Sequence, residues 1–200
     1  MKTGIMGGTF DPIHIGHLMA AEAARDACGL EEVWFMPSHT PPHKQQAGVT
    51  GEMRLDMTEK AISSNPHFRL LDVEVKRQGV SYTVDTIRDL KKEWPEHDFH
   101  FIIGADMVNY LPKWNRIQEL ADMLSFIGLN RPGSPLDTEQ LPDFLKRRVH
   151  IVDMPMLDIS SSDIRHKAEN GESIRYMVPD PVYEYISRSG IYGVQSGTAD

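Results

Sequence analysis

The chain has 200 residues, 40% hydrophobic and 25% charged, which is an ordinary composition for a globular protein with a sizeable core. Its formal net charge of −8 argues against sequence-independent binding to nucleic acid or to an acidic membrane, because both need a basic face. The one cysteine, Cys28, cannot form an intramolecular disulfide, and no segment has the pattern of a signal peptide or a membrane span. We therefore expect a cytoplasmic protein with one domain over residues 1–200, which includes a helical portion at about 160–190. Residues 195–200 are expected to be frayed, and a homo-oligomer stays open.

Short apolar runs alternate with helical stretches along the whole chain. Strands are predicted at residues 2–6, 33–37, 68–75, 99–103, 124–129 and 149–152. Helices are predicted at about residues 15–28, 52–63, 83–94, 161–169 and 181–188. This alternation predicts an α/β fold with a doubly wound parallel sheet. Such a sheet binds its ligand beyond the carboxyl ends of its strands, so residues that follow strands are the candidates for a site.

The strongest motif, GGTFDPIHIGH, runs from Gly7 to His17 between the first strand and the first helix. The paired glycines Gly7 and Gly8 let the backbone approach a ligand, and a helix N-terminus presents N–H groups to an anion. His14 and His17 lie three residues apart and should share a face of the first helical turn. Two imidazoles at this place can clamp a phosphate and gain positive charge as it binds. The motif is neither a dinucleotide fingerprint nor a P-loop, and a zinc pair lacks a third ligand at a recognisable spacing.

A second motif, ISSSDIR, occupies residues 159–165. Serines at a helix start form an N-cap, and Arg165 lies one turn inside the helix. A hydroxyl-rich helix start with an arginine fork suits the β- and γ-phosphates of a nucleotide. Taken alone, the serines are equally well explained as an ordinary cap.

Further candidates follow other predicted strands. Ser38 comes at the end of a strand, and Lys44 lies in the loop beyond it, where its charge could neutralise a phosphate; loop lysines are more often only solvated. Tyr82 and Thr83 begin a helix whose first N–H groups could hold a carboxylate, although a plain cap is a serious competitor.

The strand at 99–103 leads into Gly104 and Asp106, and Asp106 could accept hydrogen bonds from ribose hydroxyls. Trp114 follows in a proline-containing loop and could stack on the flat ring of a ligand, although a lone tryptophan is more often part of the core. Arg131 follows the strand at 124–129 and is a weaker candidate for a nucleotide contact.

The T-F-D-P-x-H-x-G-H part of the first motif resembles the nucleotidyltransferase superfamily, in which both histidines contact a nucleotide triphosphate. The segment 159–165 resembles the I-S-S-T-x-I-R signature of adenylyltransferases, with Ser162 in place of threonine. Together with Tyr82–Thr83 and Trp114, these motifs resemble the bacterial nicotinate mononucleotide adenylyltransferases, with order and spacing kept from Gly4 to Arg165. The string HIGH also resembles class I aminoacyl-tRNA synthetases, but those are much longer and carry a lysine-rich second signature that this chain lacks.

The resemblance implies a Rossmann-like nucleotidyltransferase fold and a transferase of NAD biosynthesis, with ATP and nicotinate mononucleotide as partners. The adenylyl group of ATP would pass to nicotinate mononucleotide by direct in-line attack at the α-phosphate, giving deamido-NAD and pyrophosphate. Mg²⁺ would be bound through the ATP phosphates. Catalysis is assigned to His14, His17, Lys44 and Arg165. ATP binding is assigned to Gly7, Gly8, Thr9, Phe10, Gly104, Asp106, Arg131, Ile159, Ser160, Ser161 and Arg165. Nicotinate mononucleotide binding is assigned to Ser38, Lys44, Tyr82, Thr83, Tyr110 and Trp114.

Two alternatives stay open. A sister adenylyl- or cytidylyltransferase that acts on another phosphate acceptor would share the histidine motif. Outside the enzymes, the chain could be a nucleotide-binding module with a dead site, which the intact histidines, Lys44 and Arg165 argue against.

Overall fold

The computed structural model describes residues 1–39, 48–130, 138–155 and 157–193. Its centre is a six-stranded parallel sheet in the order β3-β2-β1-β4-β5-β6. The strands are β1 (Lys2–Gly8), β2 (Glu32–Pro37), β3 (Phe68–Leu70), β4 (Asp98–Gly104), β5 (Ser125–Asn130) and β6 (Val149–Asp153). The α-helices are α1 (Ile15–Cys28), α2 (Gly51–Ile62), α3 (Val73–Arg77), α4 (Thr83–Glu93), α5 (Ala105–Val108), α6 (Ile117–Met123), α7 (Asp143–Lys146), α8 (Ser161–Glu169) and α9 (Asp180–Ser189). Short 3₁₀ turns are η1 (Leu111–Lys113), η2 (Thr138–Gln140) and η3 (Ile191–Gly193).

The order of the strands confirms the predicted doubly wound sheet. From β3, at one edge, the chain crosses over to β4 on the other side of β1. The strand order therefore reverses between β1 and β4, and the crevice beyond their carboxyl ends is where such sheets bind ligands. The motif with the two histidines begins at the end of β1, and Gly104 is the last residue of β4.

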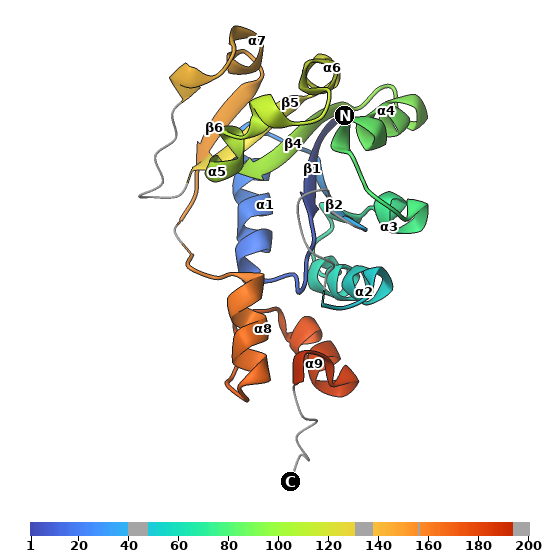
Figure 1. Cartoon of the computed structure of the whole chain (residues 1–200), viewed down its shortest axis with the longest axis vertical. Helices are drawn as coiled ribbons and strands as arrows, with labels where there is room; N and C mark the ends of the chain where they lie inside the picture. Colours follow the sequence, from blue (N-terminus) through green and yellow to red (C-terminus); the bar gives the residue numbers. More distant parts are fainter. Residues whose placement is uncertain (40–47, 131–137, 156, 194–200) are drawn as a thin grey trace.

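Two apolar cores cover the two faces of the sheet. Ala21 of α1, Met57 of α2 and Ile164 of α8 belong to one core, together with side chains of α9. Ile87 of α4 and Leu120 of α6 belong to the other. In Figure 1, α8 and α9 lie together beyond the end of the sheet, next to the start of α1. The C-terminal helices thus close over the end of β1 that carries the histidine motif.

The predicted strand at 68–75 is wrong in its second half. Leu71 still donates its N–H to the carbonyl of Phe35 on β2 (2.8 Å), but α3 begins at Val73. The next bond of this parallel ladder would need an N–H on Pro37, and proline has none. The strand therefore ends where its neighbour can no longer donate.

The other predicted strands and helices are confirmed to within about two residues at each end. Gly29 has a φ of 62° and caps α1 in the left-handed conformation that glycine adopts most easily. The short helices α5, α6 and α7 were not predicted, because brief segments carry little periodicity. Within the described ranges, every helix is too short or too polar to cross a membrane.

The step from α3 to α4 is built around a buried carboxyl group, that of Glu74. The hydroxyl of Thr86 on α4 donates to Glu74 Oε1 (2.9 Å) and accepts from Arg77 Nη1 (3.0 Å). Only 3% of Glu74 is exposed, and this burial raises the pKa of its carboxyl above 4.5, with the Thr86 hydrogen bond opposing the shift. The bonds anchor the first turn of α4, which begins at Thr83.

We expect Glu74→Gln to make the free energy of unfolding less dependent on pH. A carboxyl whose pKa is raised on folding binds its proton more tightly in the folded state, so stability is lost as pH rises from about 4.5 through the folded value. Glutamine keeps an acceptor for Thr86 but cannot ionise, so the variant should match the wild type in acid and exceed its stability near neutral pH. Urea unfolding between pH 4 and 8 measures this.

The control is Glu93→Gln, which changes an exposed glutamate at the end of α4. It should leave the pH dependence of the wild type in place. An unchanged pH slope in Glu74→Gln would contradict the assignment.

Candidate active site

The carboxyl ends of β1 and β2 are joined by one buried guanidinium group. Ser38, just after β2, donates its N–H to the carbonyl of Gly8 (2.9 Å). Arg54 Nη1 donates to the carbonyls of Thr9 (2.7 Å) and Ser38 (2.6 Å), and its Nη2 donates to the carbonyl of His39 (3.2 Å). These carbonyls lie past the last residues of β1 and β2, where the strand ladder no longer supplies donors. Arg54 thus holds the two loops that leave the sheet at the site.

Arg54 was not predicted as a site residue. It is 1% exposed on α2, and burial lowers the pKa of its guanidinium, while Asp11 opposes the shift. A signal for it exists in the sequence, because Arg54 stands three and seven residues before Met57 and Ala61, on the apolar stripe of the helix. A charged residue on such a stripe indicates a buried role.

His14 and His17 lie together at the start of α1. His14 is the N-cap rather than part of the first turn, and the two rings stack with centroids 3.7 Å apart. The N–H of His14 donates to Nδ1 of His17 (3.2 Å). In neutral His17 the proton therefore resides on Nε2. The ring of Phe10 packs edge-on against His17 at 5.0 Å, so this donor is held in place.

The glycine between the histidines leaves room for the ring of His14. A Cβ on Gly16 would lie 3.1 Å from Cε1 and Nδ1 of His14, closer than a side chain readily tolerates. The first N–H of the helix, on Ile15, donates to the carbonyl of Met177 (3.0 Å). The expectation that the helix start offers its N–H groups to an anion is therefore wrong for Ile15, because the C-terminal segment takes that donor.

Internal contacts also account for the preceding residues of the motif. Phe10 is 2% exposed and packs against Phe35, so its side chain belongs to the core. A Cβ on Gly7 would lie 2.8 Å from the ring of Phe101, and one on Gly8 would lie 2.8 Å from Phe10. The glycines allow this packing, and their contact with ATP stays a prediction.

The second motif folds against the first. Ser160 caps α8 by accepting the N–H of Asp163 (3.1 Å), as predicted. The hydroxyl of Ser161 donates to the carbonyl of Pro12 (2.9 Å). Arg165 donates from Nη1 to the carbonyl of Asp11 (2.6 Å) and from Nη2 to Ser162 Oγ (3.4 Å). Ile159 is half-buried just before this helix.

Asp11 is a second residue that the sequence pattern did not single out. It is 4% exposed, and its Oδ2 accepts the N–H of Gly48 (2.7 Å) while its Oδ1 accepts the hydroxyl of Tyr192. Arg165 Nη1 lies 3.8 Å from Oδ2. The carboxylate therefore joins the histidine motif, α8 and the C-terminal turn η3.

On the other side of the switch point, β4 ends at Gly104. A Cβ there would lie 2.6 Å from Oδ1 of Asp106, which is exposed in the first turn of α5. Tyr110 is 56% exposed, and Lys113 Nζ lies 4.5 Å from the centre of its ring. Trp114 is half-buried and packs at right angles to the rings of Phe101 (5.7 Å) and Phe126 (6.3 Å). Part of Trp114 therefore belongs to the core, and stacking on a pyridine ring stays a prediction.

The predicted carboxylate site lies at the start of α4. Tyr82 is the N-cap and is 40% exposed, and its carbonyl accepts the N–H of Asp85 (3.0 Å). Hydrogen bonds from Arg116 and Arg88 hold the pKa of the Asp85 carboxyl below its usual range. Thr83 is half-buried beside it. Hydrogen bonds thus hold the first turn of α4 in place, and its contact with a ligand stays a prediction.

Two candidates, Lys44 and Arg131, lie outside the described residues. Across the residues that are described, no group of three His, Cys, Asp or Glu side chains could hold a metal ion.

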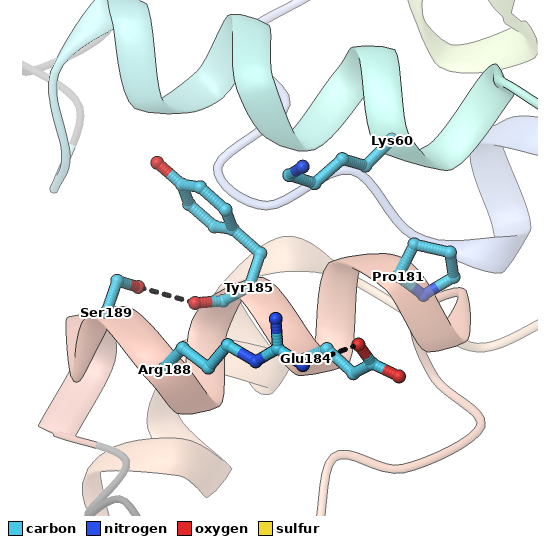
Figure 2. A pocket seen from close by; sticks show the side chains of 6 residues that line it. All are labelled: Lys60, Pro181, Glu184, Tyr185, Arg188 and Ser189. Atoms are coloured by element: carbon cyan, nitrogen blue, oxygen red, sulfur yellow. Dashed lines mark hydrogen bonds and ion pairs between the residues drawn. The ribbon is translucent and has the colours of Figure 1, made fainter.

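Two hollows lie away from these residues. One, of about 380 Å³, lies between α2 and α9 and is lined by Lys60, Tyr185 and Arg188 among others, as Figure 2 shows. The other, of about 550 Å³, lies near the starts of β1 and β4 and is lined by Lys2 and His100. The histidine motif lines neither hollow.

The chain is similar to known proteins over nearly its full length. A family model described as cytidylyltransferase-like matches residues 5–167. The "Probable nicotinate-nucleotide adenylyltransferase" of Oceanobacillus iheyensis is 48% identical, over 96% of this chain and 97% of its own. A protein of the same name from Geobacillus thermodenitrificans is 47% identical, over 100% of this chain and 89% of its own.

A solved structure has the same fold. It is the nicotinic acid mononucleotide adenylyltransferase of Plasmodium falciparum complexed with NaAD, with a TM-score of 0.79 and 21% sequence identity. The match covers 98% of this chain and 99% of that one. With its Rossmann-like sheet, paired histidines and close relatives, the chain belongs to the nicotinate-nucleotide adenylyltransferase family of the cytidylyltransferase-like superfamily.

Proposed function

We propose that this protein transfers the adenylyl group of ATP to nicotinate mononucleotide, giving deamido-NAD and pyrophosphate in NAD biosynthesis. The observation that carries the proposal is the stacked pair of His14 and His17 past the end of β1, with Arg165 bonded to the carbonyl of Asp11 in the same motif. Such a group of donors and one permanent cation suits a triphosphate. The relatives' shared name supports nicotinate mononucleotide as the acceptor.

The proposed reaction is a single displacement. A 5′-phosphate oxygen of nicotinate mononucleotide attacks the α-phosphorus of ATP, and the bond from that phosphorus to the bridging oxygen breaks as pyrophosphate leaves. Catalysis then consists of positioning and of stabilising charge on the leaving group. His17 would donate from Nε2, because its Nδ1 accepts the N–H of His14. Arg165, His14 and Lys44 would share the remaining charge.

The ATP side of the site is proposed to include the end of β1 and the start of α8. Its residues would be Gly7, Gly8, Thr9, Phe10, Ile159, Ser160 and Ser161, with Gly104, Asp106 and Arg131 toward the nucleoside. Phe10 would contribute through its backbone, since its side chain is buried. Mg²⁺ would reach the site bound to the ATP phosphates and would offset their charge.

The acceptor side is proposed to lie along the starts of α4 and η1. Tyr82 and Thr83 would hold the nicotinate carboxylate, while Trp114 and Tyr110 would contact the ring and Ser38 and Lys44 the phosphate. A cytoplasmic location fits this chemistry, because Cys28 needs no oxidising compartment.

His17→Ala should lower kcat by about a hundredfold or more, because a donor to the developing charge is lost. His14→Ala should behave similarly. Pyrophosphate release measures both, with circular dichroism to confirm folding. His166→Ala, an exposed histidine on α8, is the matched control and should retain full activity. Wild-type kcat in the His17 variant would remove this residue from the mechanism.

The transfer should invert the configuration at the α-phosphorus once. Direct attack gives one inversion, whereas a covalent adenylyl-enzyme would need two displacements and give net retention. ATP that is chirally labelled at the α-phosphorus reports the outcome. Retention would replace the direct mechanism with a covalent one.

The enzyme should prefer nicotinate mononucleotide to its amide. A carboxylate accepts charge-assisted bonds at a helix start with both oxygens, whereas an amide turns an NH₂ group toward the same donors. This mismatch should cost about 1–3 kcal/mol, or roughly 5- to 150-fold in kcat/KM. A panel of adenylyl acceptors in the pyrophosphate assay measures the ratio.

Trp114→Ala should weaken both acceptors alike, because stacking contacts the ring face that they share. Equal kcat/KM for acid and amide in the unmodified enzyme would refute the proposal that Tyr82 and Thr83 hold the nicotinate carboxylate. Activity only on a different phosphate acceptor would assign the chain to a sister reaction.

A further inference from the structure

The carboxylate of Asp11 receives hydrogen bonds from two segments far apart in the sequence. Gly48 donates its N–H to Oδ2 (2.7 Å), and Tyr192 donates its hydroxyl to Oδ1. Asp11 is 4% exposed, so water does not replace either donor. Its carbonyl also accepts Nη1 of Arg165 (2.6 Å). One residue of the histidine motif thus depends on the last described turn of the chain.

Tyr192 is held in the form that this bond requires. Burial raises the pKa of its phenol far above the ordinary value, and the hydrogen bond to Asp11 raises that pKa further. The phenol therefore stays protonated at neutral pH and can donate to Asp11. Its backbone has a φ of 58°, a left-handed conformation that a tyrosine rarely adopts. A bond to a buried carboxylate is one contact that can hold such a conformation.

We propose that Tyr192 is a positioning residue of the triphosphate site, acting through Asp11; this rests on the proposed function. Without the hydroxyl, Oδ1 of Asp11 would be buried and short of a donor. Arg165 is a cation that could compensate, because its Nη1 already lies 3.8 Å from Oδ2. The Asp11 carboxylate would then compete with the phosphates of ATP for the guanidinium group. The hydroxyl of Tyr192 prevents this competition.

The effect should fall on ATP and spare the acceptor. The contacts of Asp11 lead to Arg165 on α8, to Gly48 and to the turn that precedes His14. Trp114 packs with the other apolar core, on the opposite face of the sheet, together with Val84 of α4 and Leu111 of η1. A loss of general stability would instead weaken both substrates together.

The test compares Tyr192→Phe with Tyr185→Phe in the full chain. Tyr185 is a matched control, because its hydroxyl also donates to an aspartate, Asp56 Oδ2 (3.2 Å), across the packing of α9 on α2. Figure 2 shows Tyr185 beside Lys60 in the hollow away from the histidine motif. Each variant changes a tyrosine in the C-terminal part of the chain and deletes one hydroxyl that donates to a carboxylate.

Pyrophosphate release is measured with ATP varied at saturating nicotinate mononucleotide, and then the reverse. Tyr192→Phe should raise the KM for ATP by about 5- to 50-fold and change the KM for nicotinate mononucleotide by less than about twofold. Tyr185→Phe should change neither. In the Asp11→Asn background, Tyr192→Phe should not raise the KM for ATP, because the carboxylate that would compete for Arg165 is gone.

The outcomes separate the two proposals. Absence of pyrophosphate release in the wild type would refute the proposed function. An active wild type with equal effects on both substrates, or with Tyr192→Phe no different from Tyr185→Phe, would overturn the role of Tyr192. If Tyr192→Phe does not fold alone, it is measured in the Asp11→Asn background: a KM for ATP equal to that of Asp11→Asn alone supports the link, and a higher KM for ATP overturns it.

Discussion

The central position of β1 in a parallel sheet is the constraint on which this site depends. Because β2 and β4 flank β1 in the same direction, the carboxyl ends of all three strands meet at one edge. The peptide groups just past this edge have left the ladder and must find partners elsewhere. Arg54 supplies donors to three carbonyls there, and Asp11 supplies acceptors to a neighbouring N–H and a hydroxyl. Both partners are charged side chains that lie almost entirely out of water.

This arrangement gives the motif loop a defined shape before any ligand binds. Phe10 packs into the core and against His17, and the N–H of His14 fixes which nitrogen of His17 can donate. Two carbonyls in the same loop accept from Ser161 and Arg165 of α8. A rigid set of donors costs less to organise when the charge on a leaving group develops, which is the physical basis of catalysis without a covalent nucleophile.

Several features of the fold could be read from the sequence because they follow from local periodicity or from a single residue. Gly29 ends α1 in a left-handed conformation, and Ser160 caps α8, as their positions in the pattern indicate. The strand predicted up to Val75 fails for a reason that is not local, because the ladder stops where Pro37 of the neighbouring strand has no N–H to donate. From the sequence, Trp114 could lie in the core or at a ligand. Only its contacts with Phe101 and Phe126 show that part of its ring belongs to the core.

By itself, the sequence determined the alternation of strands and helices, the parallel sheet and the two motifs at its edge. These are consequences of periodicity, of capping and of short spacing, all of which act over a few residues. Only the tertiary structure decided how the motifs are held, because Asp11 meets Tyr192 across 181 positions and Arg54 meets Thr9 across 45. These bonds contribute because water cannot replace a buried partner, and burial depends on which elements pack together. The sequence alone therefore does not distinguish a charged residue that is solvated from one that is buried and holds the site in place.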